Sequence, residues 1–141
     1  LGELIWTVTK KNPFKKKSLY SLKKRIEKCK NLTKKIKKIK IKYFDQTIGS
    51  TNTIDLIKHL KKKNTDLFFI IGSDNLTNLH KWKSWKLLTK LTKIVVFSRK
   101  DYDAKAKKSV IVKSVNKKKI IFINNKNINI SSTQIRQSLL S

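Results

Sequence analysis

The feature that most constrains the fold is the run Leu-Phe-Phe-Ile-Ile at residues 67–71, which is apolar at every position and is followed by Gly72. A strand that is apolar on both faces is covered on both faces, which is typical of a parallel sheet. Two further apolar runs, at residues 93–99 and 119–124, predict similar strands. Residues 4–8 and 110–115 predict shorter strands. Residues 36–45 alternate lysine with isoleucine and predict a half-buried strand.

Segments with apolar residues three and four positions apart lie between these strands and predict helices at residues 18–30, 50–63, 76–91 and 130–141. Residues 101–109 predict a loop or a weak helix. Alternation of strand and helix predicts a doubly wound, mainly parallel α/β sheet with right-handed crossovers and helices on both faces. We expect one domain over residues 1–141, because no repeat or linker divides the chain.

The chain carries 36 Lys plus Arg against 8 Asp plus Glu, a net charge of +28 over 141 residues. This excess favours an anionic partner: nucleic acid, a membrane surface or phosphorylated small molecules. Lysine, isoleucine and asparagine are abundant together, so biased composition is the alternative explanation. Arginine, which suits bidentate recognition of bases and phosphates, is scarce, and this weakens the interpretation as a nucleic-acid binder.

Two further features bear on the setting of the chain. Cys29 is the single cysteine, which excludes an internal disulfide and fits a reducing cytoplasm. No apolar run approaches the roughly 20 residues that span a bilayer. The chain begins with Leu1 and contains no methionine, so we expect a fragment, a processed chain or a misassigned start.

The carboxyl ends of the strands are where a sheet of this kind binds ligands. Four segments are expected at that edge: Asn12-Pro13 with its lysines, Gly72-Ser73-Asp74, Ser98-Arg99 and Ser131-Ser132-Thr133. Gly72 would let the backbone approach a ligand closely, with Asp74 accepting bonds from ribose hydroxyls. The alternative is that Gly72 only turns the chain and Asp74 caps the next helix.

Two other patterns are open to a functional and a structural interpretation. Ser131-Ser132-Thr133 opens a helix whose free N–H groups suit an anion, with Arg136 one turn further, although an ordinary helix cap has the same sequence. Trp82 and Trp85, three positions apart, either belong to the core or stack on a heteroaromatic ring. His59 and His80 lack partners at metal-ligand spacing and are interpreted as surface residues.

Taken in order, the motifs resemble those of the bacterial nicotinate-nucleotide adenylyltransferases. "FFIIGSDNLTNLHKW" is similar to the family pattern F-I-I-G-x-D-x-L…W, and "ISSTQIR" to I-S-S-T-x-I-R. "LIWTVTKKNPFK", "RIEKC", "TNTIDLI" and "IVVFSRKDY" resemble further family segments. The similarity spans nearly the whole chain.

The resemblance implies transfer of the adenylyl group of ATP to nicotinate mononucleotide, with Mg²⁺ on the phosphates and release of pyrophosphate. It implies that Gly72 and Asp74 contact the nucleotide sugar, that Arg99 lies near the adenosine, and that Trp82 stacks on the nicotinate ring. The residues implied for ATP are Gly72, Asp74, Arg99, Ser132, Thr133 and Arg136; those implied for the mononucleotide are Asn12, Lys15, Thr53, Trp82 and Lys83.

The sequence also departs from the family pattern. The segment G-G-x-F-[DN]-P-x-H-x-G-H, which supplies the catalytic histidines and the central first strand, is absent, as is the usual final helix. We therefore expect impaired catalysis by this chain alone and assign no catalytic residue in it. A phosphopantetheine-type adenylyltransferase and a basic nucleic-acid-binding domain are the alternatives, and a homo-oligomer is left open.

Overall fold

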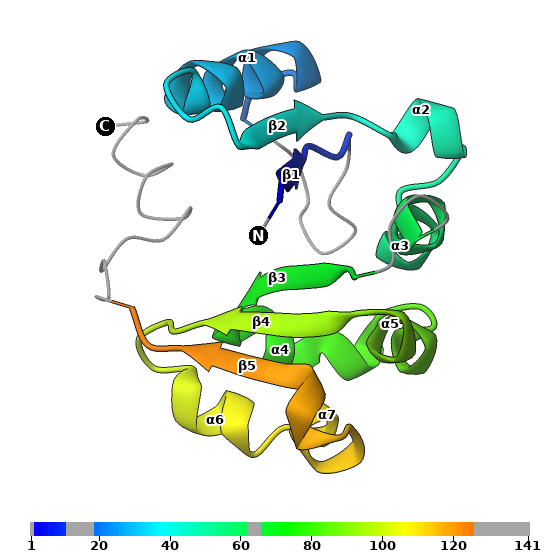
Figure 1. Cartoon of the computed structure of the whole chain (residues 1–141), viewed down its shortest axis with the longest axis vertical. Coiled ribbons are helices and arrows are strands. Elements are labelled where there is room, and N and C mark those ends of the chain that lie inside the picture. The colour runs from blue at the N-terminus through cyan, green and yellow to red at the C-terminus, as the bar shows by residue number, and fades with distance from the viewer. Residues whose placement is uncertain (1, 11–18, 62–65, 126–141) are drawn as a thin grey trace. The chain divides into compact units, whose positions relative to one another are not determined.

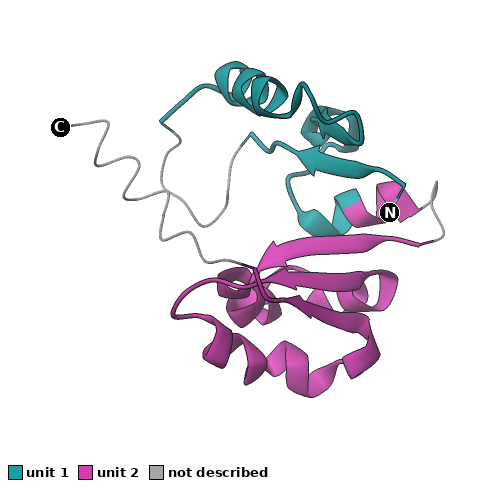
Figure 2. Ribbon diagram, turned by 60° about the vertical axis from the view of Figure 1, so that its left-hand side comes forward, with its two compact units in different colours: residues 1–56 teal, residues 57–141 magenta. Residues whose placement is uncertain are grey.

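The computed structural model describes residues 2–10, 19–61 and 66–125 as two compact units, residues 1–56 and 57–141 (Figures 1 and 2). The expectation of a single domain stays a prediction. In the described residues, the strands pair only in parallel, as the sequence predicts for an α/β fold. No helix in those ranges is long and apolar enough to cross a membrane.

Unit 1 contains a two-stranded sheet of β1 (Leu4–Thr7) and β2 (Ile39–Lys42). Exposed and half-buried residues alternate along both strands. In β2 the exposed positions are lysines and the half-buried positions are isoleucines. The connection is α1 (Leu22–Thr33), which starts where the Ser21 side chain accepts a hydrogen bond from the Lys24 amide. The short helix α2 (Asp45–Ile48) follows and ends at Gly49, whose φ of 66° is left-handed.

The helix α3 (Thr53–Lys61) begins in unit 1 and ends in unit 2. Its predicted apolar stripe is confirmed, since Ile54, Ile57 and Leu60 are all buried. Asn52 precedes the first helical residue, and its backbone oxygen accepts hydrogen bonds from the amides at positions 55 and 56.

Unit 2 contains a three-stranded sheet of β3 (Phe68–Gly72), β4 (Lys93–Phe97) and β5 (Ile120–Ile123), in that order. Figure 1 shows the helices α4 (Ser73–Asn78), α6 (Asp103–Lys107) and α7 (Val110–Ser114) on one face of this sheet. The core lies between that face and the helices and comprises Ile71, Leu76, Leu79, Ile94, Val96, Ala106 and Ile111.

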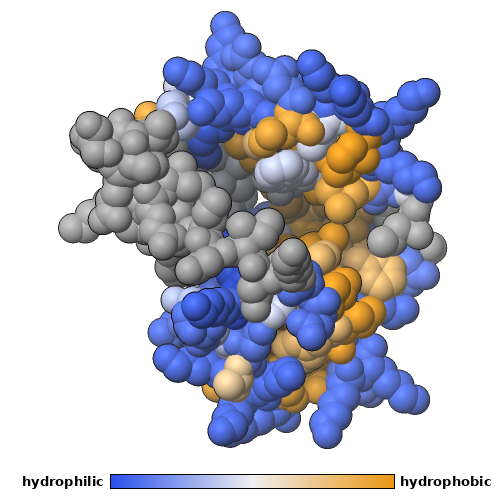
Figure 3. Space-filling view, turned by 90° about the vertical axis from the view of Figure 1, so that its left-hand side faces the viewer, coloured by the Kyte–Doolittle hydropathy of each residue, from blue (hydrophilic) through white to orange (hydrophobic). Residues whose placement is uncertain are grey.

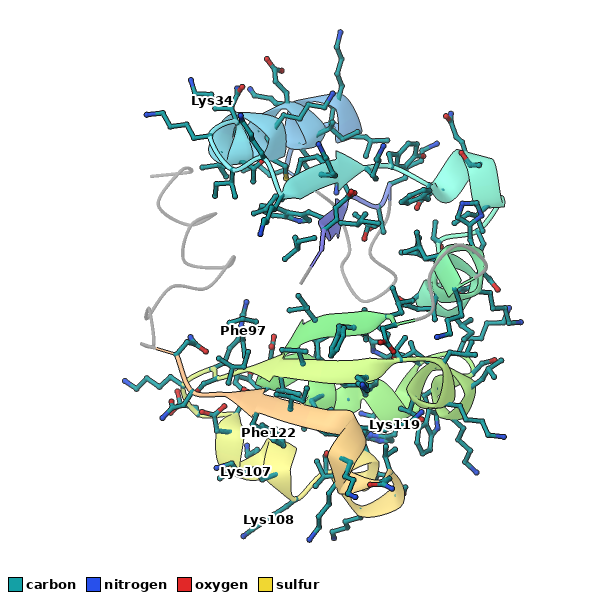
Figure 4. All side chains as sticks on the ribbon, viewed as in Figure 1. Lys34, Phe97, Lys107, Lys108, Lys119 and Phe122 are labelled. Carbon is teal, nitrogen blue, oxygen red and sulfur yellow. The ribbon has the colours of Figure 1, made fainter. Side chains whose placement is uncertain are left out.

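The other face of the unit 2 sheet carries the alternate strand residues. Ile70 is 40% exposed and Phe97 38% exposed on it, whereas Phe122, which pairs with Val96, belongs to the helix-bearing face (Figure 4). The prediction that these strands are covered on both faces therefore holds for the centre of β4. It does not hold for Ile70 in the outer strand β3 or for Phe97 at the end of β4.

The prediction of a strand at residues 110–115 is wrong, because residues 110–114 form the helix α7. A run of valine and isoleucine suits either element when it is short. The topology decides, because two parallel neighbours such as β4 and β5 need a crossover connection. As a helix, the segment buries Ile111 completely in the core. Residues 103–107 likewise form a helix, α6, within the predicted loop or weak helix.

The single helix predicted over residues 76–91 is also wrong. The chain forms α4, then a 3₁₀ turn η1 (Leu79–Lys81), and then α5 (Trp85–Leu91). Trp82 is extended and Ser84 is left-handed, with φ of 52°. Trp82 and Trp85 thus do not share a helix face. The break lets Leu79 and Leu88, on different helical segments, both become fully buried.

Candidate functional site

The carboxyl ends of the three strands of unit 2 lie at one edge of the sheet. Gly72 pairs with Phe97, and Phe97 pairs with Ile123. The loops that leave β3 and β4 are therefore neighbours. The Ser98 amide donates to the backbone oxygen of Ile123 at 3.1 Å, which continues the sheet by one residue.

Ser73 joins the two loops. It is fully buried, and its Oγ accepts a hydrogen bond from the Arg99 amide at 3.0 Å. The same hydroxyl lies 3.5 Å from the backbone oxygen of Arg99, to which it donates. A buried hydroxyl with both its donor and its acceptor used fixes the backbone of residue 99 against the start of α4.

Asp74 and Arg99 form an ion pair across this edge. Arg99 Nε lies 3.5 Å from Asp74 Oδ1, and the two side chains are 56% and 28% exposed. The oxygen Asp74 Oδ1 is itself buried and accepts no hydrogen bond within the described residues. The pair is thus too long for a strong hydrogen bond, and both side chains are partly exposed at this edge of the sheet.

Gly72 is needed at the end of β3 for space. Its backbone is extended, with φ of −83° and ψ of 159°, so any residue could adopt this conformation. A Cβ at this position would lie 2.4 Å from Asp74 Oδ1 and 3.1 Å from Arg99 Nε. The glycine therefore brings the charged pair against the strand end. Asp74 lies in the first turn of α4 and does not cap it, because the cap position is Gly72.

Asp103, in the first turn of α6, completes the cluster. Its Oδ1 accepts the Arg99 amide at 3.0 Å, and its Oδ2 accepts the Ser98 hydroxyl in a short hydrogen bond. The Ser98 hydroxyl, which donates to Oδ2, and the Arg99 amide, which donates to Oδ1, lower the pKa of the Asp103 carboxyl below its usual value. The sequence analysis missed Asp103, although its place four residues after Arg99, at a helix start, is a signal for such a contact.

Trp82 and Lys83 follow η1 and do not belong to the Asp74–Arg99 pair. The Trp82 ring is half-buried against the core of unit 2, with its centroid 6.2 Å from that of Phe69 and the planes at 67°. This edge-to-face contact is typical of packed aromatic rings. Lys83 is exposed.

Unit 1 carries a separate polar groove of about 490 Å³. Its lining residues come from the end of β1 and from the segment around α2: Lys10, Tyr43, Asp45, Gln46, Gly49, Ser50, Thr51 and Asn52. The Lys10 amide donates to Asp45 Oδ2 at 2.7 Å. The Ser50 hydroxyl donates to Asp55 Oδ2 at 2.7 Å, which holds residues 50–52 against the start of α3. The predicted site residue Thr53 follows this groove directly in the chain.

The structure thus brings Gly72, Asp74 and Arg99 together, and the predicted meeting of these two loops is confirmed. Asn12, Lys15, Ser132, Thr133 and Arg136 lie outside the described residues. Within those residues, no three His, Cys, Asp or Glu side chains gather as a metal site would require. On the face in Figure 3, hydrophilic side chains cover most of the outer surface of each unit, as expected of solvated lysines.

Comparison with protein families matches residues 1–138 to the model described as cytidylyltransferase-like. A Pelagibacter ubique protein named "Probable nicotinate-nucleotide adenylyltransferase" is 46% identical over 138 residues, which are 97% of this chain and 77% of that protein. A Campylobacter fetus protein with the same name is 34% identical over 99% of this chain and 71% of its own length. The chain covers 54% of an Agrobacterium fabrum relative of that name.

Among solved structures, the fold is similar to the nicotinic acid mononucleotide adenylyltransferase of Plasmodium falciparum. The TM-score is 0.71 at 20% identity, over 97% of this chain and 69% of that one. That protein was solved in complex with NaAD and, in a second structure with the same TM-score, with APC.

Proposed function

Because this chain belongs to the nicotinate-nucleotide adenylyltransferases of the cytidylyltransferase-like family, we propose that it transfers the adenylyl group of ATP to nicotinate mononucleotide in NAD biosynthesis. The products are nicotinate adenine dinucleotide and pyrophosphate. The observation that carries the proposal is the cluster of Gly72, Asp74 and Arg99 at the carboxyl edge of a parallel sheet.

The adenosine side of ATP is assigned to this cluster. Asp74 places a carboxylate at this edge with its side chain 28% exposed, and a carboxylate accepts hydrogen bonds from ribose hydroxyls. Arg99 is a fixed positive charge beside it, more than half exposed and thus open to ligand. Gly72 leaves room for this pair against the end of β3, where a Cβ would meet Asp74 Oδ1 and Arg99 Nε. Ser132, Thr133 and Arg136 are proposed to hold the phosphates.

The mononucleotide side is assigned to the residues that the family resemblance implies. Thr53 and the backbone at Lys83 are proposed to bind the nicotinate carboxylate, and Trp82 to stack on the ring. Asn12 and Lys15 would meet the phosphate. The polar groove that precedes Thr53 supports this assignment, because hydroxyl and amide groups at residues 50–52 line it. Trp82 is half-buried and makes an edge-to-face contact with Phe69, and an indole ring stacks well on a heteroaromatic ring.

The chemistry is a single displacement. An oxygen of the mononucleotide phosphate attacks the α-phosphorus of ATP, and the bond from that phosphorus to the pyrophosphate oxygen breaks. The protein supplies positioning and positive charge rather than a nucleophile. We propose that Mg²⁺ enters with ATP on its phosphate oxygens, since this ion is commonly held by substrate phosphates. A cytoplasmic location is proposed, which the single cysteine supports.

The experiment is a calorimetric titration of the full chain with ATP and with nicotinate mononucleotide. The expected result is saturable binding of both and an ATP affinity about tenfold lower in Arg99→Ala, the loss of one charged contact. Lys100→Ala, next to Arg99 and also exposed, is the matched control for charge and should change the affinity little. Absence of nucleotide binding, or equal losses in the two variants, would refute the assignment.

A second set of titrations tests which molecule accepts the adenylyl group. Phosphopantetheine in place of nicotinate mononucleotide tests the related adenylyltransferases, and duplex DNA over a range of salt tests a nucleic-acid function. Preference for either would overturn the proposed substrate while leaving the fold untouched.

A further inference from the structure

We propose that Asp103 is a positioning residue for nucleotide binding, which acts by holding Arg99 in place toward Asp74. The inference rests on the proposed function of the Asp74–Arg99 cluster. It concerns a residue of α6 that lies outside that pair and is not itself assigned a contact with ATP.

The contact with Asp74 alone does not hold the Arg99 side chain in one position. This side chain is 56% exposed and its Nε lies 3.5 Å from Asp74, too long for a strong hydrogen bond. A long, exposed side chain loses rotamer entropy when it is held in one geometry. Its place is therefore decided mainly by the backbone of residue 99.

Both the amide and the carbonyl of Arg99 form hydrogen bonds. The Arg99 amide donates to Asp103 Oδ1 and to Ser73 Oγ, both at 3.0 Å. The Arg99 carbonyl accepts the Tyr102 amide at 3.1 Å, which closes a turn with Asp101 at a left-handed φ of 71°. Asp103 is the charged member of this set, and hydrogen bonds to a charged acceptor are the stronger ones.

The helix that carries Asp103 packs on the core of unit 2. Asp103 lies three residues before Ala106, which is fully buried in that core. Residues three apart share a helix face, so α6 presents Asp103 from the side that packs on the core. The short hydrogen bond from the Ser98 hydroxyl fixes the second carboxylate oxygen. The pKa of Asp103 is lowered because the hydrogen bonds from Ser98 and from the Arg99 amide favour the charged carboxylate.

The test is a double-mutant cycle on ATP affinity with Arg99→Ala, Asp103→Ala and the double variant. Asp103→Ala should weaken ATP binding about tenfold, the scale of one charged hydrogen bond. In the Arg99→Ala background the same change should have no further effect beyond about twofold, the usual scatter of additivity. A role in general stability would instead give additive losses, and that result would overturn the proposal.

Two variants serve as controls. Asp101→Asn removes a neighbouring carboxylate at a position where asparagine tolerates the left-handed backbone, and it should leave the affinity unchanged. Asp103→Asn keeps one carbonyl acceptor of the same shape and should recover part of the loss. It also replaces Asp103→Ala in the cycle if the alanine variant does not fold.

A second readout does not depend on ATP. Hydrogen exchange measured by NMR should show that the Arg99 amide loses protection in Asp103→Ala and keeps it in Asp101→Asn. If the wild-type chain does not bind ATP, the proposed function fails, and the exchange rates still decide whether Asp103 holds Arg99. Unchanged protection of the Arg99 amide in a folded Asp103→Ala protein would overturn the inference.

Discussion

The two units of this chain are stabilised in different ways. Unit 2 has a core in which Ile94 and Val96 of the central strand and Leu76 of α4 are fully buried. In unit 1, by contrast, no residue of β1 or β2 is buried. Two strands alone are marginal in water. The comparison shows that the parallel sheet pattern can be the same while the apolar burial that supports it differs greatly.

Polar ties supply part of the support in unit 1. Arg25 of α1 donates to the backbone oxygens of Thr9 and Lys10, at 2.9 and 3.0 Å. The Lys10 amide in turn donates to Asp45 Oδ2. These contacts hold the end of β1 against two helices. Unit 2 uses its polar contacts at the edge of the sheet instead, around Ser73, Arg99 and Asp103.

The largest expected effect comes from matched truncations in the two sheets. Ile94→Ala should lower the free energy of unfolding by about 2–5 kcal/mol, because it leaves a cavity at a fully buried position. Ile41→Ala, in half-buried β2, should cost about half as much or less. Urea unfolding followed by circular dichroism measures both. Equal losses would contradict the contrast between the units.

The polar ties of unit 1 are tested by Arg25→Ala. Two hydrogen bonds from a charged donor to backbone oxygens are lost, and we expect a cost of about 1–3 kcal/mol. Lys23→Ala on the same helix, an exposed lysine, should change the unfolding free energy by no more than about 0.5 kcal/mol. Equal losses of unfolding free energy for the two substitutions, measured by urea unfolding, would show that the hydrogen bonds of Arg25 do not stabilise unit 1.

A smaller effect is expected from adding a methyl group to the cluster. Gly72→Ala places a Cβ 2.4 Å from Asp74 Oδ1, so the charged pair must move. The pair is partly exposed and can move, so we expect a loss of no more than about 1 kcal/mol in unfolding free energy, together with weaker ATP binding. Gly2→Ala is the matched control in unit 1, since no atom lies within 4 Å of the added Cβ. Its unfolding free energy should stay within about 0.5 kcal/mol of the wild type.

The smallest effect is the acid dependence of the cluster in unit 2. The pKa of Asp103 is lowered from its model-compound value of 3.8, chiefly by the Ser98 hydroxyl. A carboxylate with a lowered pKa in the folded state stabilises the protein above its unfolded pKa, and this is lost as the pH falls through the folded pKa. The difference in unfolding free energy between wild type and Asp103→Asn should be constant above about pH 5.

That difference should shrink as the pH falls below 3.8, the value at which the unfolded carboxyl titrates. Asp101→Asn, which removes a neighbouring carboxylate, is the control. A difference that grew toward low pH would contradict the direction of the shift. The measurement is urea unfolding at a series of pH values.

From the amino-acid sequence alone we could predict the strands of both units, the helix α3 and the meeting of residues 72–74 with residues 98–99. These rest on local apolar patterns and on the rule that parallel strands end at one edge, so no long-range information is needed. The roles of Trp82 and Thr53, and of the site residues outside the described ranges, stay predictions.

Tertiary packing, by contrast, was needed to establish the helix at residues 110–114, the break at residues 82–84 and the contacts of Asp103. In the first two, burial of Ile111 and of Leu79 with Leu88 outweighs local propensity. In the third, the contact forms because α6 is fixed on the core by Ala106. Apolar periodicity reports which residues are buried, but the direction of a side chain toward a partner depends on how whole elements pack.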